Sequence, residues 1–202
     1  VDACMNTPLG DLVDPATGCS MLQIDADGDR VPDDVELLTG TDPTDGCSFE
    51  VNDIDLQLQS SSEWDSLDCD GDGIINLIEG VLDVDGDGSI NLDDTDADGD
   101  GVLDSVENFV DSTSFVDPCD FEIQSISETV SNFWLDGDCD MDGLLNEEEQ
   151  YADTDGDGIP NFQDMDSDGD GVTDSTEVYV DFTDHLSACS FVLSSITITP
   201  SA

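Results

Sequence analysis

Seven short acidic segments with one shared spacing constrain the fold of this chain more than any other feature. Each carries aspartates at alternate positions, as in DADGDR from residue 25 and DSDGDG from residue 166. An apolar residue usually follows at place 7, Asp or Asn at place 9, and Glu or Asp at place 12. We name each segment by the number of its first residue: Asp25, Asp68, Asp83, Asp96, Asp138, Asp153 and Asp166.

The spacing matches the ligand geometry of calcium. This cation takes about six to eight oxygen ligands, and a loop of about 12 residues supplies them from side chains at places 1, 3, 5, 9 and 12 and from the backbone carbonyl at place 7. A glycine at place 6 lets the backbone turn with a positive φ at little steric cost. A solvated acidic linker does not require such spacing, so the sequence predicts about seven calcium sites.

The predicted ligands occupy the same six places in every loop. In loop order they are Asp25, Asp27, Asp29, Val31, Asp33 and Glu36; Asp68, Asp70, Asp72, Ile74, Asn76 and Glu79; Asp83, Asp85, Asp87, Ser89, Asn91 and Asp94; Asp96, Asp98, Asp100, Val102, Asp104 and Glu107; Asp138, Asp140, Asp142, Leu144, Asn146 and Glu149; Asp153, Asp155, Asp157, Ile159, Asn161 and Asp164; Asp166, Asp168, Asp170, Val172, Asp174 and Glu177. Two loops depart from the pattern, because Arg30 replaces the place-6 glycine of loop 25 and Met141 the place-4 glycine of loop 138.

The net charge excludes several classes of protein. There are 53 acidic residues against one basic residue and one histidine, which gives a net charge of -52. So few cationic side chains cannot neutralise nucleic-acid phosphates, and anionic membrane surfaces are disfavoured for the same reason. No apolar run approaches the length of a membrane span. The acidic charge also opposes compaction of the bare chain, which favours a fold that depends on bound cations.

Seven cysteines indicate an oxidising compartment. Their spacing suggests three disulfides, Cys4 with Cys19, Cys47 with Cys69, and Cys119 with Cys139, and leaves Cys189 over, either for another chain or as a reduced buried thiol. Each disulfide would contribute roughly 3 kcal/mol. Disulfides persist outside the cytosol, where calcium modules can bind weakly, so we expect an extracellular or cell-surface protein.

The chain repeats with a period near 70, the separation of Trp64 from Trp134 and of Cys69 from Cys139. This period predicts a lead-in at 1–46 with one calcium loop and two repeats, at 47–118 and 119–188, each with a strand, a Trp/Cys unit and three loops. A C-terminal strand at 189–202 would begin a third repeat. The expected fold is mostly irregular calcium-loop repeats with short helices and short β-strands, in an elongated, disulfide-stapled tandem-repeat architecture.

The expected strands and helices lie between the loops. Partial alternation of apolar residues predicts strands at 47–59, 119–130 and 189–199. Short helices are expected after the loops, with capping-box spacing between Asn146 and Glu149. Further boundary signals are the helix caps Asp33, Asp104 and Asp174 and the helix stop Gly40.

Successive loops start only 13 or 15 residues apart within 68–107 and 138–177, so no entering helix fits between them. Residues 83–107 and 153–177 resemble thrombospondin type 3 repeats instead. That resemblance implies loops wound around a row of calcium ions with little ordinary core, and junction carboxylates that touch two ions, here Asp94 with Asp96 and Asp164 with Asp166. The segments ACMNTPLGDLVDPATGCS and GTDPTDGCSF are similar to cysteine-flanked calcium repeats of secreted and surface proteins of the Bacteroidetes type.

The sequence gives little support for a catalytic site, and we expect a protein that is not an enzyme. His185 is the only histidine and has no nucleophile at motif spacing. The many paired carboxylates stand at ligand places rather than as a glycosidase pair, and a phosphate loop lacks its lysine. Trp64 and Trp134 could stack on a sugar, but their identical phase favours a packing role.

Two functional hypotheses remain open. The first is an extracellular calcium-stabilised structural repeat protein, a subunit of a fibre or filament assembled head to tail. Its partners would be calcium and other copies of the chain, joined as a homopolymer through the C-terminal strand and Cys189, with no nucleic acid and no membrane insertion. The second is a calcium-rigidified stalk or adhesin module that binds a surface ligand or presents another domain. Acidic residues outside the loops keep it open: Asp93, Asp111, Asp117 and Asp181.

Overall fold

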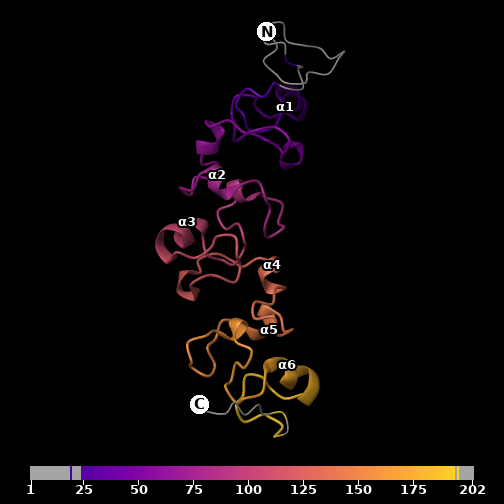
Figure 1. The fold of residues 1–202 in the computed structure, drawn as a ribbon, viewed down its shortest axis with the longest axis vertical. Coiled ribbons are helices and arrows are strands. Elements are labelled where there is room, and N and C mark those ends of the chain that lie inside the picture. The colour runs from indigo at the N-terminus through magenta and orange to yellow at the C-terminus, as the bar shows by residue number, and fades with distance from the viewer. Residues whose placement is uncertain (1–18, 20–23, 194, 196–202) are drawn as a thin grey trace. The chain divides into compact units, whose positions relative to one another are not determined.

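The computed structural model describes residues 19, 24–193 and 195, in which six short α-helices are joined by single turns and long irregular segments (Figure 1). The α-helices are α1 (Asp33–Thr39), α2 (Asn76–Glu79), α3 (Asp104–Val106), α4 (Asn132–Leu135), α5 (Asn146–Glu149) and α6 (Asp174–Thr176). The 3₁₀ turns are η2 (Val51–Asp53), η3 (Trp64–Ser66), η4 (Asn91–Asp93), η6 (Ile123–Ser125) and η7 (Asn161–Gln163). The π turns η5 (Glu107–Asp111) and η8 (Glu177–Asp181) follow α3 and α6 directly.

The predicted strands at 47–59 and 119–130 are wrong, because the residues that the structure describes form no strand. These segments contain the 3₁₀ turns η2 and η6, and their backbone donors bond to loop carbonyls. The Asp55 N–H donates to the Arg30 carbonyl at 2.9 Å, and the Ser127 N–H donates to the Gly101 carbonyl at 2.9 Å. Backbone N–H groups that a β-ladder would need therefore donate to carbonyls of the acidic loops instead. Most of the third segment, 189–199, lies outside the described residues.

The predicted elongated tandem-repeat architecture is also wrong. The chain divides into two compact units, one comprising Val1–Val84 with Gly88–Thr95 and the other Asp85–Asp87 with Asp96–Ala202. The boundary near residue 96 does not follow the expected repeats at 47–118 and 119–188. Those repeats, the lead-in at 1–46 and the segment at 189–202 stay predictions about the sequence.

An aromatic cluster forms the core of the second unit. Trp134, 1 % exposed, packs with Phe121, Phe162 and Val102. Tyr151 stacks on Trp134 with ring centroids 4.9 Å apart, and Phe121 stacks on Phe162 at 5.4 Å. Aromatic pairs of this kind contribute about 0.5–1.5 kcal/mol beyond their buried area. The prediction that this tryptophan packs in the interior is confirmed.

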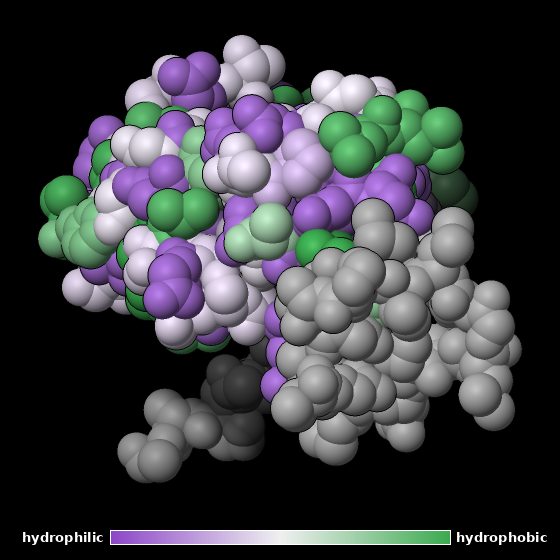
Figure 2. All heavy atoms as spheres, turned by 90° about the horizontal axis from the view of Figure 1, so that it is seen from above, coloured by the Kyte–Doolittle hydropathy of each residue, from purple (hydrophilic) through white to green (hydrophobic). Residues whose placement is uncertain are grey.

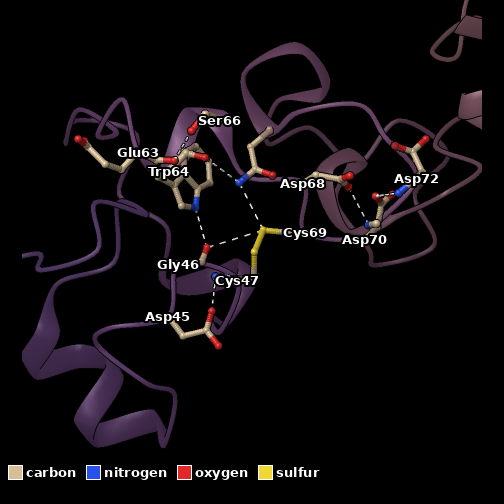
Figure 3. Close-up of a disulfide and its surroundings, with 12 residues drawn as sticks. Asp45, Gly46, Cys47, Glu63, Trp64, Ser66, Asp68, Cys69, Asp70 and Asp72 are labelled. Carbon is tan, nitrogen blue, oxygen red and sulfur yellow. Dashed lines mark hydrogen bonds between the residues drawn. A yellow bond between two sulfur atoms is a disulfide. The ribbon is translucent and has the colours of Figure 1, made fainter. Parts of the chain in front are cut away.

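Trp64 holds the same place in the first unit. It is 2 % exposed and packs with Ile90 and Leu92. Its indole N–H donates to the Gly46 carbonyl at 2.6 Å beside the disulfide (Figure 3). The guanidinium of Arg30 lies 5.5 Å from the ring centroid. The place-6 residue that departs from the loop pattern therefore covers the core tryptophan with a cation–π contact.

Two of the three predicted disulfides are confirmed. Cys47 bonds to Cys69 with Cα atoms 5.4 Å apart, and Cys119 bonds to Cys139 with Cα atoms 5.6 Å apart. Cys4 lies outside the described residues. Cys189 is exposed and forms no disulfide. Each confirmed bond ties the start of a 70-residue repeat to place 2 of its first acidic loop.

The expected helix boundaries are partly wrong. Asp33, Asp104 and Asp174 are the first residues of α1, α3 and α6 rather than their caps. The predicted capping box of Asn146 and Glu149 is wrong, because the N-cap of α5 is Leu145, whose side chain cannot accept a hydrogen bond. Only the Glu148 side chain accepts, from the Leu145 N–H at 3.0 Å. Gly40 does end α1, in a left-handed conformation with a φ of 99°.

A serine ahead of each tryptophan contacts an earlier acidic loop. The Ser61 N–H donates to the Gly28 carbonyl at 3.0 Å, and the Ser131 N–H donates to the Gly99 carbonyl at 2.7 Å. The hydroxyl of each serine accepts from the backbone N–H of the tryptophan three residues later. A Cβ atom at Gly28 or Gly99 would collide with the serine side chain. These contacts place the loops of residues 25 and 96 against the tryptophan segments. The spacing of the acidic residues does not predict these serine contacts.

Large apolar side chains are left on the surface after several loops. Leu37 is 73 % exposed, Leu38 86 % and Val110 72 %. Figure 2 shows apolar residues interspersed with hydrophilic ones on the visible face. Because much of the apolar area stays in contact with water, the two aromatic cores are small. Apolar burial alone is therefore a weak source of stability for this fold.

Candidate metal centres

The acidic loops are held in shape by hydrogen bonds from their backbone N–H groups to their first aspartates. In loop 68, Asp68 accepts from the Gly71 N–H at 2.7 Å through Oδ1 and from the Gly73 N–H at 3.0 Å through Oδ2. The Oδ1 atom of Asp70 accepts from the Asp72 N–H at 3.1 Å. The three carboxylates lie next to the disulfide (Figure 3). The same pattern recurs in loops 25 and 153.

Carboxylate oxygens of the first three aspartates in a loop converge on one point. One ligand atom each from Asp68, Asp70 and Asp72 lies within 4.8 Å of the other two, and equivalent groups form in loops 25 and 96. The Oδ2 atoms of Asp70 and Asp72 are buried and have no hydrogen-bond partner. Three convergent carboxylates repel one another unless a cation lies between them. The structure therefore brings together the predicted ligands at places 1, 3 and 5.

Glutamates at place 12 complete these groups. Glu36 and Glu149 are 0 % exposed and Glu79 is 5 % exposed, and none of their six carboxylate oxygens has a hydrogen-bond partner. A buried charge without a partner costs several kcal/mol. The oxygen-only donor set fits a hard divalent cation, and carboxylates with flexible loop geometry fit calcium. The side chains present thus fit the predicted ion.

The seven loops are of two kinds. The five that end in glutamate bury that residue, whereas loops 83 and 153 end in aspartate and have no fully buried carboxylate. At the end of loop 153, Asp164 accepts from the Asp166 N–H at 3.0 Å, so the second junction pair is in contact through the backbone. We expect the exposed loops to bind calcium less tightly because water competes there.

Residues at place 9 brace the loop backbone as well as standing near its other acids. One side-chain oxygen accepts from the place-2 N–H at 2.8–3.1 Å in loops 25, 96, 138, 153 and 166. Where place 9 is asparagine, its amide also donates to the backbone carbonyl 12 residues earlier. Asn146, for example, donates to the Trp134 carbonyl at 2.7 Å. Asparagine at this place therefore anchors the loop to the preceding segment, which the ligand pattern does not predict.

Burial and crowding raise the pKa values of the loop carboxyls. Burial first, and then the charges of Asp29 and Asp27, raises the pKa of Glu36 to about 8. Burial and then Asp140 and its neighbours raise the pKa of Glu149 to about 9. Without a cation, such groups hold protons at neutral pH. Binding of a divalent cation would release those protons.

We expect the calcium-free protein to become less stable as the pH rises above about 4.5, until the compact fold is lost near neutral pH. In this window the folded state binds more protons than the unfolded chain, because the pKa of Glu36 rises from 4.5 to about 8 on folding. The free energy of unfolding should be measured by urea titration after calcium is removed on a chelating resin. Millimolar calcium should flatten or reverse the trend, since the ion holds the carboxylates deprotonated. Stability that increases with pH in the calcium-free protein would contradict this prediction.

Comparison with known proteins gives one match. A family model described as BamM C-terminal matches residues 119–197, which is 79 of the 202 residues. No curated protein and no solved structure matches significantly. The match indicates a location associated with the cell envelope or outer membrane. Within the described residues, every helix is too short to cross a membrane.

The match corrects three expectations from the sequence. The resemblance to thrombospondin type 3 repeats is wrong, because the matched family is a different one. The fibre or filament subunit, its head-to-tail homopolymer through the C-terminal strand and Cys189, and the alternative stalk or adhesin role are overturned with it. The match lends no support to calcium binding, which stays a prediction from the residues.

Proposed function

We propose that this chain is a calcium-binding, non-enzymatic protein of the cell envelope that takes part in assembly at the outer membrane. The family match over 119–197 supports the place and the process. The buried carboxylates of the acidic loops support the ion. Loops 138, 153 and 166 lie inside the matched stretch, so three of the seven proposed calcium sites belong to the part of the chain that carries the likeness.

Glu149 is the observation that carries the calcium proposal. It is 0 % exposed, and both of its carboxylate oxygens are buried without a partner. The only Lys or Arg of the chain is Arg30, which lies in the other compact unit. No protein cation is therefore available to Glu149 in its own unit apart from His185. Calcium would supply the positive charge that this buried carboxylate and its aspartate neighbours require.

The ions would change the surface as well as the interior. Seven calcium ions would add 14 positive charges to the net charge of -52 and leave -38. The calcium-bound protein would then present an acidic surface, suited to a basic surface on an assembly partner. The non-enzymatic part of the proposal rests on the ligand spacing of the loop carboxylates, which differs from a catalytic acid–base pair.

A matched pair of variants tests calcium binding. Glu149→Gln is expected to remove about one bound ion, because a neutral amide replaces the place-12 carboxylate. Glu147→Gln makes the same charge change two residues away on an exposed side chain and should retain every ion. Calcium content should be measured by atomic emission on the dialysed full chain. Absence of bound calcium in the unsubstituted protein at millimolar calcium would overturn this half of the proposal.

The envelope role needs an experiment in the source cells. The tagged chain should fractionate with the outer membrane and crosslink to proteins of the outer-membrane assembly machinery. Deletion of its gene should lower the amounts of outer-membrane proteins without lowering their messenger RNA. Recovery of the chain from the cytosol alone, together with unchanged outer-membrane proteins, would contradict the role whether or not calcium is bound.

A further inference from the structure

Loop 166 contacts loop 138 although the first residues of the two loops are 28 positions apart. The Ser175 N–H donates to Oδ2 of Asp142 at 3.0 Å. The Tyr179 hydroxyl donates to the Gly143 carbonyl at 2.8 Å. Thus α6 and the π turn that follows it touch loop 138 at places 5 and 6. The two loops belong to the same compact unit.

Asp174 is the chain neighbour of one residue in this contact. It is 0 % exposed and directly precedes Ser175. Its Oδ1 atom accepts from the Ser167 N–H at 3.0 Å, and its Oδ2 atom accepts from the Ser167 hydroxyl at 2.5 Å. Each carboxylate oxygen has two acceptor sites, so both oxygens keep one for a further ligand. Asp142 is among the residues whose charge raises the pKa of Asp174, after the larger effect of burial.

Glu149 independently indicates that a cation belongs in loop 138. Its carboxylate is fully buried, and neither oxygen has a partner. Burial first, then Asp140 and Asp142, and then Asp174 raise the pKa of Glu149 to about 9. Loop 138 itself has only Asn146 at place 9. The oxygen of that asparagine accepts from the Cys139 N–H at 3.1 Å, and its amide donates to the Trp134 carbonyl.

We propose that Asp174 is a ligand of the calcium ion in loop 138 as well as a member of loop 166, so that the two loops bind calcium cooperatively. The inference rests on the proposed calcium binding. Asn146 directs its side chain to the backbone, and the Asp174 carboxylate supplies the charged oxygen that this place lacks. A shared carboxylate lowers the affinity of either loop when the other is disabled.

Asp174→Asn tests the shared ligand in the full chain. Asparagine retains an oxygen for the Ser167 N–H, as Asn161 does for Thr154 in its own loop. The backbone amide signals of Gly143 and Gly171 should be followed by NMR during a calcium titration. The calcium concentration at the midpoint for Gly143 should rise by about 10-fold or more. Asp33→Asn, the same change at the same place of loop 25, should leave the Gly143 midpoint unchanged.

A second variant covers the case in which Asp174→Asn does not fold. Asp166→Asn disables place 1 of loop 166 and should also raise the midpoint for Gly143. An unchanged Gly143 midpoint in either folded variant, with only the Gly171 midpoint moved, would overturn the shared ligand. Absence of any calcium-dependent shift in the unsubstituted protein would instead mean that the proposed function itself fails. The two failures are therefore distinguishable.

Discussion

Removal of calcium at neutral pH is expected to abolish the compact fold and expand the chain. Emptied loops place several carboxylates within 4.8 Å of one another, and the glutamates at place 12 are then buried without a partner. The two small aromatic cores cannot offset both this repulsion and the conformational entropy of 202 residues. Binding and folding then become one event. The stability lost on calcium removal should equal the whole free energy of unfolding of the calcium-bound protein.

Circular dichroism and small-angle X-ray scattering during a chelator titration would measure this loss. The radius of gyration should rise towards about 48 Å, the value for an unfolded chain of this length. Sodium chloride added to the depleted protein should restore only part of the compaction, since screening weakens repulsion without supplying ligands. A compact apo state that unfolds cooperatively at moderate ionic strength would show that the cores and disulfides are sufficient.

Trp134→Ala is expected to lower the free energy of unfolding by about 3–5 kcal/mol in saturating calcium. The indole is 1 % exposed and touches Tyr151, Phe121 and Phe162, so its removal leaves a cavity between aromatic rings. Phe133→Ala is the matched control, since this neighbouring side chain is 46 % exposed. Its cost should stay below about 1 kcal/mol. Denaturant unfolding with calcium held constant measures both.

The two tryptophans should differ when each is replaced by phenylalanine. Trp64 donates its indole N–H to the Gly46 carbonyl, whereas the indole nitrogen of Trp134 has no hydrogen-bond partner. Trp64→Phe therefore leaves the buried Gly46 carbonyl without its indole donor. It should lower the free energy of unfolding by about 1–3 kcal/mol more than Trp134→Phe does. Equal losses would indicate that the Gly46 bond contributes nothing to stability.

The sequence predicts local features of this protein well. The Cys47–Cys69 and Cys119–Cys139 bonds and the burial of the tryptophans follow from spacing and repeat phase, because neighbours in the chain make those contacts. The strands failed because weak alternation cannot show that loop carbonyls will take the backbone donors. The partner of Ser131, which is Gly99, lies in a different loop, and no local pattern identifies it.

The acidic pattern predicts a kind of metal site rather than a protein family. A loop of about 12 residues specifies where a cation can bind, because the spacing of the oxygens is set by the ion. It does not specify the protein that carries the loop, since the same site can stand on unrelated chains. The match over 119–197 therefore changes the functional interpretation from a fibre to the cell envelope while the residues at each place keep their geometry.

The serine contacts at Gly28 and Gly99 restrict how such a chain could evolve. In loop 138 the equivalent place carries Met141, 86 % exposed, and a Cβ at Gly71 or Gly156 would meet nothing within 4 Å. Single loops are therefore not interchangeable. If loop 138 replaced the loop at residue 96, its methionine would stand at the place of Gly99 and collide with the Ser131 side chain. Duplication of a whole block of about 70 residues keeps each glycine with its serine. Growth or shortening of the chain by entire blocks is then tolerated, whereas recombination inside a block is not.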